Sequence, residues 1–438
     1  MNKNMIAEGA TMGATTYSHK EHAIAIAPFH SHFFESLHKE QWKEVRLGEV
    51  AKFGNGKARP KSLGNIPIYG GNGILGYTDK FNYEGETIII GRVGAYCGCV
   101  YCENKQIWVS DNALIAKPKY DNSTKFLYYL LKHMNLNSHA EGSSQPLITQ
   151  TLLNNLHVRI CKNHETQNQI AEILSSFDDK IDLLHRQNKT LESLALTLFR
   201  HTFIDNPNRN EWEMGKLGDW LIETIGGDWG KEEPINDFQE KVFCIRGTDI
   251  ADLNKGLADK TPIRYIKKNK LATLEPKEGD IIFEISGGTE TQSTGRCVFV
   301  NQQVKTLFEY PIVFSNFCKL LRVKKKEYSY FLYLYLQHLY HSDEFFALEN
   351  GTSGIKNLNY KALFYELEYK MPSEIQVIEF HEKVKIYFDK INASKKQIQN
   401  LQSMRDMLLA KILNEDSQLR RKNNDYARKG GNTQIQKH

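Results

Sequence analysis

The chain has 438 residues, of which 40% are hydrophobic and 25% charged, so it can form several buried cores and is not disordered throughout. No apolar run approaches the roughly 20 residues of a membrane span, and no signal-peptide pattern is present, so a cytoplasmic protein is expected. The formal net charge is +5, but residues 418–438 hold six Lys or Arg and one Asp, so the rest sums to zero and gives poor evidence for nucleic-acid binding.

Residues 1–40 are expected to be a leader segment. Five of the 15 histidines lie between His19 and His38, without a helical or paired ligand pattern. A solvated segment is therefore the preferred interpretation of this stretch.

The stretch from Gly71 to Gly76 fits G-x-G-x-x-G, the phosphate-binding fingerprint of dinucleotide enzymes. That fingerprint needs a strand before it and a helix after it. Here the preceding strand would be only Ile66–Tyr69, and strand and turn formers follow Gly76. A Gly-rich loop between short strands is the better interpretation.

Three cysteines lie close together in CGCVYC, at positions 97, 99 and 102. A zinc site would need a fourth ligand at a matching spacing, and the other cysteines are scattered singly. Free thiols on a hairpin are expected, and no metal.

The chain repeats itself. Trp42–Glu49 recurs as Trp212–Asp219, and four further stretches recur in the same order with a growing offset: Glu84–Ile89 at 278–282, Phe126–Tyr128 at 331–333, Gly142–Ser144 at 351–353 and Asp179–Ile181 at 389–391. A growing offset with kept order indicates two copies of one unit, the second with loop insertions.

Each copy opens with a part rich in Gly, aromatic and β-branched residues. These parts, residues 41–162 and 206–372, are expected to be mainly β with short helices such as the one near Phe126–His133.

Each copy ends in a long helix, expected over 163–205 and 373–414. Apolar rows at seven-residue spacing define a coiled-coil seam; its predicted members are Leu174, Phe177, Ile181, Leu184, Asn188, Leu191, Leu198, Val384, Tyr387, Ile391, Ile398, Leu401 and Leu408. Because each apolar row needs a partner, the two helices are expected to pair with each other, most simply antiparallel. Pairing with another chain is the alternative. Residues 415–438 are expected to be a basic, flexible tail.

The predicted fold is therefore α+β. Two mainly-β domains with short helices are separated by two long antiparallel coiled-coil helices, in a pseudo-two-fold internal repeat.

This tandem resembles the specificity subunit of type I restriction-modification enzymes over nearly all of residues 42–413. In the first domain the resemblance depends on IPIYGGNGILGYTD, TIIIGRVGAYCGCVY and IWVSDNALIAKP. In the second it depends on CIRGTDI, EGDIIFEISGGTETQSTGRCVFV and GTSGIKNLNYKALFYELEYKMP.

The resemblance implies a subunit without a catalytic centre, whose two target recognition domains each read one half of a bipartite DNA site. It also implies that the helices dock two methyltransferase subunits, to which translocase-nuclease subunits can be added. S-adenosylmethionine, ATP and Mg²⁺ would belong to those partners, and none would be bound by this chain. The sequence agrees: it has no Pro-Pro pair, no G-x-x-x-x-G-K-[ST] loop and no Pro-Asp before Glu-x-Lys.

The candidate DNA-binding residues lie on Gly-rich or polar loops, where short side chains and backbone can approach bases and phosphates. Those of the first domain are Lys57, Arg59, Lys61, Tyr69, Asn72, Tyr77 and Arg92. Those of the second are Arg246, Thr248, Asp249, Ser286, Thr289, Gln292, Thr294, Arg296, Lys356 and Asn357. For each single residue, ordinary surface or hairpin structure is the alternative. The stretch SGGTETQSTGR suits hydrogen-bond readout better than charge attraction.

A second function remains open. The chain could be a coiled-coil adaptor that assembles a protein complex without reading DNA. Because the Gly- and polar-rich loops differ between the two copies, two different ligands, and hence two DNA half-sites, are favoured.

Overall fold

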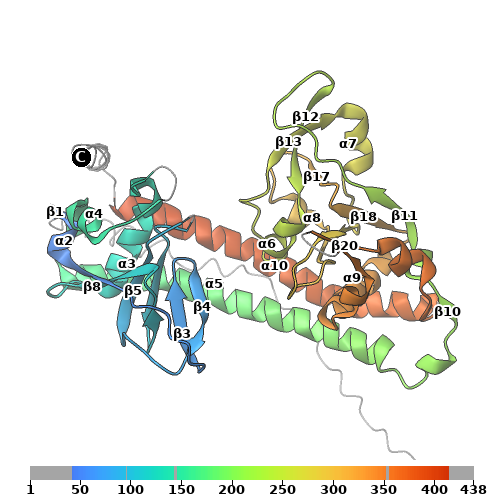
Figure 1. Ribbon diagram of the computed structural model, residues 1–438, viewed down its shortest axis with the longest axis horizontal. Helices are drawn as coiled ribbons and strands as arrows, with labels where there is room; N and C mark the ends of the chain where they lie inside the picture. The colour runs from blue at the N-terminus through green and yellow to red at the C-terminus, as the bar shows by residue number, and fades with distance from the viewer. Residues whose placement is uncertain (1–41, 95, 143–145, 352–354, 414–438) are drawn as a thin grey trace, which may run out of the picture. The chain divides into compact units, whose positions relative to one another are not determined.

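The computed structural model describes residues 42–94, 96–142, 146–351 and 355–413. The expected leader and basic tail, and parts of the repeat at 143–144 and 352–353, lie outside these ranges. The described residues divide into two compact units, 42–174 with 406–413 and 175–405 (Figure 1). Within the described ranges, no helix combines the length and apolar character needed to cross a membrane.

The first unit contains a four-stranded antiparallel sheet in the order β2-β8-β5-β6 and a three-stranded sheet in the order β4-β3-β7. The strands of these sheets are β2 (Ala51–Asn55), β3 (Ile66–Gly70), β4 (Gly73–Thr78), β5 (Glu86–Gly91), β6 (Val100–Asn104), β7 (Trp108–Val109) and β8 (Ala113–Pro118). In the smaller sheet β3 and β4 are antiparallel, and β7 is parallel to β3. A separate pair joins β1 (Trp42–Arg46) to β9 (His157–Cys161).

Strand β5 shows why this unit has two cores. Ile88 and Ile90 pack with the short helices α2 (Leu47–Val50), α3 (Thr124–His133) and α4 (Gln150–Asn155), whereas Ile89 faces a second cluster with Tyr69. Successive side chains of a strand point to opposite faces, so the apolar run of β5 indicates a strand covered on both sides.

The second unit repeats this topology. Its four-stranded sheet has the order β11-β18-β14-β16, its three-stranded sheet the order β13-β12-β17, and β10 (Met214–Gly215) pairs with β21 (Tyr369–Lys370). The sheet strands are β11 (Leu221–Gly226), β12 (Phe238–Ile245), β13 (Ile263–Lys267), β14 (Ile281–Glu284), β16 (Cys297–Phe299), β17 (Ile312–Phe314) and β18 (Cys318–Val323). As in the first unit, the third strand of the smaller sheet is parallel to its neighbour. The predicted internal repeat is thus present in the strand order.

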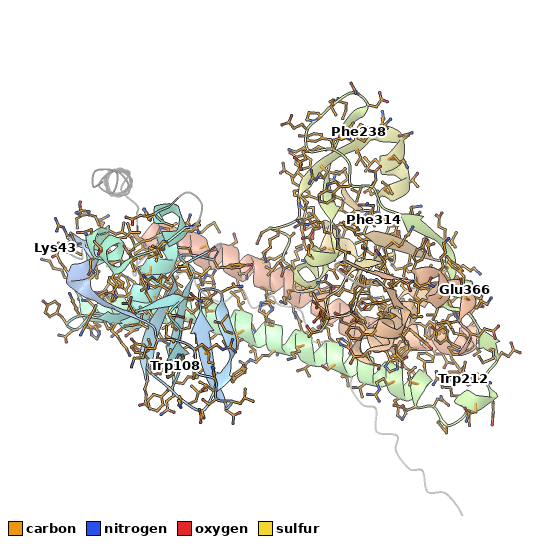
Figure 2. The ribbon with its side chains drawn as sticks, in the orientation of Figure 1. Lys43, Trp108, Trp212, Phe238, Phe314 and Glu366 are labelled. Atoms are coloured by element: carbon orange, nitrogen blue, oxygen red, sulfur yellow. The ribbon has the colours of Figure 1, made fainter. Side chains whose placement is uncertain are left out.

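The second unit also contains helix α9 (Ser329–His341), at the place of α3, and the shorter helices α6 (Ile250–Asn254), α7 (Lys268–Leu274) and α8 (Gln302–Lys305). A small extra sheet joins β15 (Ser286–Gly287), β20 (Lys356–Leu358) and β19 (Glu349–Asn350). Phe314, at the end of β17, lies inside this unit, and Phe238, at the start of β12, lies near its edge (Figure 2).

The G-x-G-x-x-G stretch is the hairpin between β3 and β4. Gly70 pairs with Gly73 across a turn made by Gly71 and Asn72, and Gly73 has φ +84°. Strand β4 follows at once where a nucleotide site would need a helix. The interpretation as a Gly-rich loop between strands is confirmed.

The two long helices are α5 (His164–Phe199), continued by a π-helical turn at Arg200–Ile204, and α10 (Glu374–Leu413), green and red in Figure 1. Within the second unit, Asp178 of α5 is ion-paired with Arg405 of α10. Further along α5, Ile181 and Leu184 pack with Ile398 and Leu401. Near its end, Phe199 lies 6.0 Å from Phe380, ring centroid to ring centroid. Positions therefore rise along one helix as they fall along the other.

The predicted seam needs a correction at both of its ends. Leu174 belongs to the core of the first unit, together with Leu408. In the second unit, five predicted seam residues lie in the core shared with α9: Leu191, Leu198, Val384, Tyr387 and Ile391. The seven-residue spacing did not reveal that one apolar row can pack both against a partner helix and against the core of a domain. It also missed the large aromatic side chains Phe199, Phe203, Phe380 and Phe388, which are buried in the same core.

Candidate nucleic-acid interface

Backbone hydrogen bonds fix the candidate loops of the first domain. Ser110 N donates to Tyr69 O at 2.8 Å, Arg92 N donates to Asn112 O at 3.0 Å, and Ile148 N donates to Arg92 O at 2.9 Å. Four segments that are far apart in the sequence therefore meet in one loop cluster.

The second domain contains the same set of bonds. Ser315 N donates to Ile245 O, Ile285 N donates to Phe317 O, and Leu358 N donates to Ile285 O, each at 2.9 Å. The donors and acceptors follow the same strands in both domains. The two loop clusters therefore share one backbone frame, and their side chains differ.

Glycine is required at one equivalent point of this frame. A Cβ at Gly56 would lie 1.8 Å from the carbonyl oxygen of Ser110, and a Cβ at Gly227 would lie 2.1 Å from that of Ser315. Neither backbone leaves room for a side chain.

Three candidate cations of the first domain are exposed, namely Lys57, Arg59 and Lys61. In the described part of the chain none of them forms an ion pair. The Lys57 carbonyl accepts a hydrogen bond from Trp108 Nε1 at 3.3 Å, which fixes the backbone there. The Arg59 guanidinium lies against β4, because a Cβ at Gly76 would lie 2.6 Å from its Nη2.

The remaining first-domain candidates separate into exposed and buried residues. Asn72, in the hairpin turn, and Tyr77, on β4, are exposed. Arg92 is half-buried, and its Nε has no hydrogen-bond partner among the described residues. The prediction of Tyr69 as a DNA contact is corrected: its side chain is 5% exposed and its hydroxyl donates to the Glu103 carboxylate. Burial raises the pKa of Tyr69 far above its usual value.

The structure brings together three second-domain loops that the sequence could only treat separately. Ser286 pairs with Asn357, and Gly287 with Lys356, between β15 and β20. A Cβ at Gly247 or at Gly287 would lie 2.3 Å from Glu284 Oε1. The loops around residues 247 and 287 thus pack against one carboxylate, and strand pairing joins the loop around residue 357 to them.

Side-chain burial divides these candidates. Thr248, Thr289, Gln292 and Asn357 are exposed. Asp249, Ser286 and Thr294 are buried, and their prediction as direct contacts is corrected here. They support the loops instead: Asp249 accepts a hydrogen bond from Arg246 N, and Thr294 N donates to Glu349 Oε1.

Each of the three candidate cations of the second domain has a carboxylate partner. Arg246 Nη2 lies 2.8 Å from Asp249 Oδ1, Arg296 Nη2 lies 2.6 Å from Glu284 Oε1, and Lys356 Nζ lies 3.1 Å from Glu349 Oε2. Hydrogen bonding to these carboxylates raises the pKa of both arginines. Arg296, predicted to contact DNA, is thus held by a structural pair.

Sequence reasoning missed the buried carboxylates of Glu284 and Glu349. The available signal for Glu284 was an acid that directly follows the apolar run Ile281–Phe283. Its counterpart by strand position in the first domain is Gly91. Comparing the two copies therefore does not predict a carboxylate at this position.

Comparison with known proteins agrees with the duplicated frame. The family model for the type I restriction modification DNA specificity domain matches residues 39–193 and 209–401. The MjaIX specificity subunit of Methanocaldococcus jannaschii is 27% identical over 390 residues, 81% of this chain and 84% of that protein. The EcoprrI specificity subunit of Escherichia coli is 30% identical over 161 residues, 35% of this chain and 40% of that protein.

A crystal structure of the type I restriction-modification S subunit from M. genitalium shares the fold. It has a TM-score of 0.50 at 19% identity, over 86% of this chain and 97% of that one. Since the family model matches twice and covers most of the chain, the chain belongs to the type I restriction-modification DNA specificity family.

Proposed function

We propose that this chain is the non-catalytic DNA-recognition subunit of a type I restriction-modification complex, and that each domain reads one half of a bipartite, asymmetric site. The observation that carries the proposal is the backbone frame shared by the two loop clusters, on which different side chains are exposed.

The exposed groups differ in a way that suits two half-sites. The first cluster offers Arg59, Asn72 and Tyr77, and the second offers Thr248 and Gln292, with Thr289 and Asn357 beside them. Arginine pairs well with guanine, and Asn or Gln pairs with adenine through two hydrogen bonds. An adaptor that bound one partner twice would be expected to repeat its exposed side chains.

We further propose that α5 and α10 form an antiparallel coiled-coil spacer, relate the domains by a pseudo-two-fold axis and dock two methyltransferase subunits. Exposed apolar residues support a docking role: Leu183 and Leu194 on α5, and Ile375 and Ile386 on α10. Each pair is eleven residues apart, which is about three helical turns and hence one face. S-adenosylmethionine, ATP and Mg²⁺ belong to the partner subunits in this proposal, which include translocase-nuclease subunits in a complete restriction enzyme.

Sequencing the methylated adenines of host cells with and without the gene tests this function. The expected result is one bipartite motif that disappears with the gene and returns with a plasmid copy. An unchanged methylome, with assembly of another complex lost, would favour the adaptor. The purified chain alone should transfer no methyl group from labelled S-adenosylmethionine to duplex DNA.

A further inference from the structure

Charge is arranged differently in the two loop clusters. In the first, Lys57, Arg59 and Lys61 are exposed without an ion pair in the described part of the chain. In the second, all three candidate cations are paired, and the side chains of their partners Asp249, Glu284 and Glu349 are only 4%, 1% and 4% exposed.

The two arginine pairs have the geometry of fixed structural contacts, whereas Lys356 and Glu349 form a single ion-pair contact at 3.1 Å. Arg296 donates from Nε and Nη2 to both oxygens of Glu284, at 2.9 and 2.6 Å. Arg246 does the same to Asp249, at 3.0 and 2.8 Å, and also donates to Lys260 O. Such bidentate pairs hold a guanidinium in one orientation.

A paired cation attracts phosphate weakly. The carboxylate cancels most of its field, and a guanidinium bound at two points would have to break that contact, leaving a buried charge, before reaching DNA. In the same cluster Glu290 is exposed and adds a negative charge. Release of counterions from DNA, which gives binding its salt dependence, needs cations that reach phosphates.

Resting on the proposed function, we propose that the two domains divide the work of recognition. The first domain supplies the phosphate attraction through its free cations. In the second, Asp249, Glu284 and Glu349 are positioning residues that neutralise the cations and fix the loops, so that its half-site is read by uncharged groups.

The sharpest test removes the negative charge of one carboxylate partner while keeping the shape of its side chain. In Glu349→Gln the amide oxygen can still accept from Thr294 N, but Lys356 loses its counter-charge. Affinity for a labelled random-sequence duplex pool is measured against salt, with the full chain and any partner subunits it needs. We expect the slope of log K against log salt to steepen by about 0.9 for the one freed cation. Base preference should weaken in one half-site only, as read by sequencing the bound pool.

The double variant Glu349→Gln/Lys356→Met removes both charges and should return the slope to the wild-type value. Glu278→Gln is the matched control, since it frees Lys326 from a 3.2 Å ion pair before the start of β14 and should leave the slope unchanged. Asp249→Asn, with and without Arg246→Met, repeats the test at a second pair if the first variant is unstable.

In the first domain, Lys57→Gln or Lys61→Gln should flatten the slope by a similar amount. An unchanged slope in Glu349→Gln, or in Asp249→Asn where that variant replaces it, or a steepened slope that persists in the matching double variant, would overturn this proposal. If the wild-type chain enriches no sequence at all, the proposed function itself fails, and the two failures are therefore distinct.

Discussion

Asp178 on α5 and Arg405 on α10 form an ion pair across 227 positions of sequence, with the Arg405 side chain 12% exposed. This pair fixes the register of the two helices, because shifting either helix by one residue would separate the charges. Removing one partner of a fully buried pair costs ~3–5 kcal/mol.

Since Asp178 is partly exposed, we expect Asp178→Asn to lower the free energy of unfolding by about 1–2 kcal/mol. The exchange Asp178→Arg/Arg405→Asp should recover part of that loss, as measured by urea unfolding. If the exchange variant is no more stable than the sum of its single changes, the pair has no role in register.

A second prediction concerns Asn188, which is buried on α5 with no hydrogen-bond partner for Oδ1 among the described residues. An unsatisfied buried acceptor costs ~1–3 kcal/mol. Asn188→Leu should therefore raise the free energy of unfolding by about 1 kcal/mol, as measured by urea unfolding. His185 is exposed on the same helix, so His185→Leu is the control and should change stability little. A destabilised Asn188→Leu variant would show that the amide makes a favourable contact.

Gly56→Ala and Gly227→Ala provide a matched pair of changes at equivalent points of the shared frame. Each added methyl group would meet a carbonyl oxygen at 1.8 or 2.1 Å. We expect each to lower stability by about 1–3 kcal/mol and to impair a different half-site in a methylome. Gly71→Ala, whose Cβ would find its nearest neighbour at 3.4 Å, is the control for thermal melting. Equal damage to both half-sites from one substitution would contradict independent reading.

A fourth prediction tests the proposed spacer. Gln399 accepts a hydrogen bond from Gln303 at 3.1 Å, so α10 also contacts the second domain at this point. One extra heptad in each helix should avoid that contact, with insertions between Leu174 and Ile181 and between Leu401 and Leu408. Each helix lengthens by ~10.5 Å at 1.5 Å per residue, or about three base pairs of DNA.

The expected outcome is a wider gap between the methylated half-sites, or loss of specific binding. A heptad in α5 alone, the control, should break the register of the pair and reduce stability. A methylome with the original gap at full modification would show that helix length does not set the separation between the two half-sites.

The sequence predicted what depends on period and order. Seven-residue spacing located the two long helices, and repeated short stretches such as Trp42–Glu49 revealed two copies with one strand order. It predicted poorly which side chains are buried, because burial depends on which face of each strand or loop the neighbouring elements cover. Tyr69 and Thr294 look like loop contacts, but neighbouring strands bury them.

The candidate site shows the same limit. No local pattern tells that Arg296 is bound to Glu284, because the loop returns to that carboxylate only when β14 and β16 pair. The strands β15 and β19 have only two residues each, too short for any alternation to be visible.

The crowded glycines at 56 and 227 also restrict how such a chain can change over generations. Where no side chain fits, any substitution of the glycine would displace the main chain, so we expect the glycine, and with it the main-chain path of the loop cluster, to be kept. Exposed neighbours such as Asn72 and Thr248 carry no such restriction, since each can be exchanged without moving the backbone. New preferences can therefore arise by single substitutions in one half of the molecule, while the other half keeps its own.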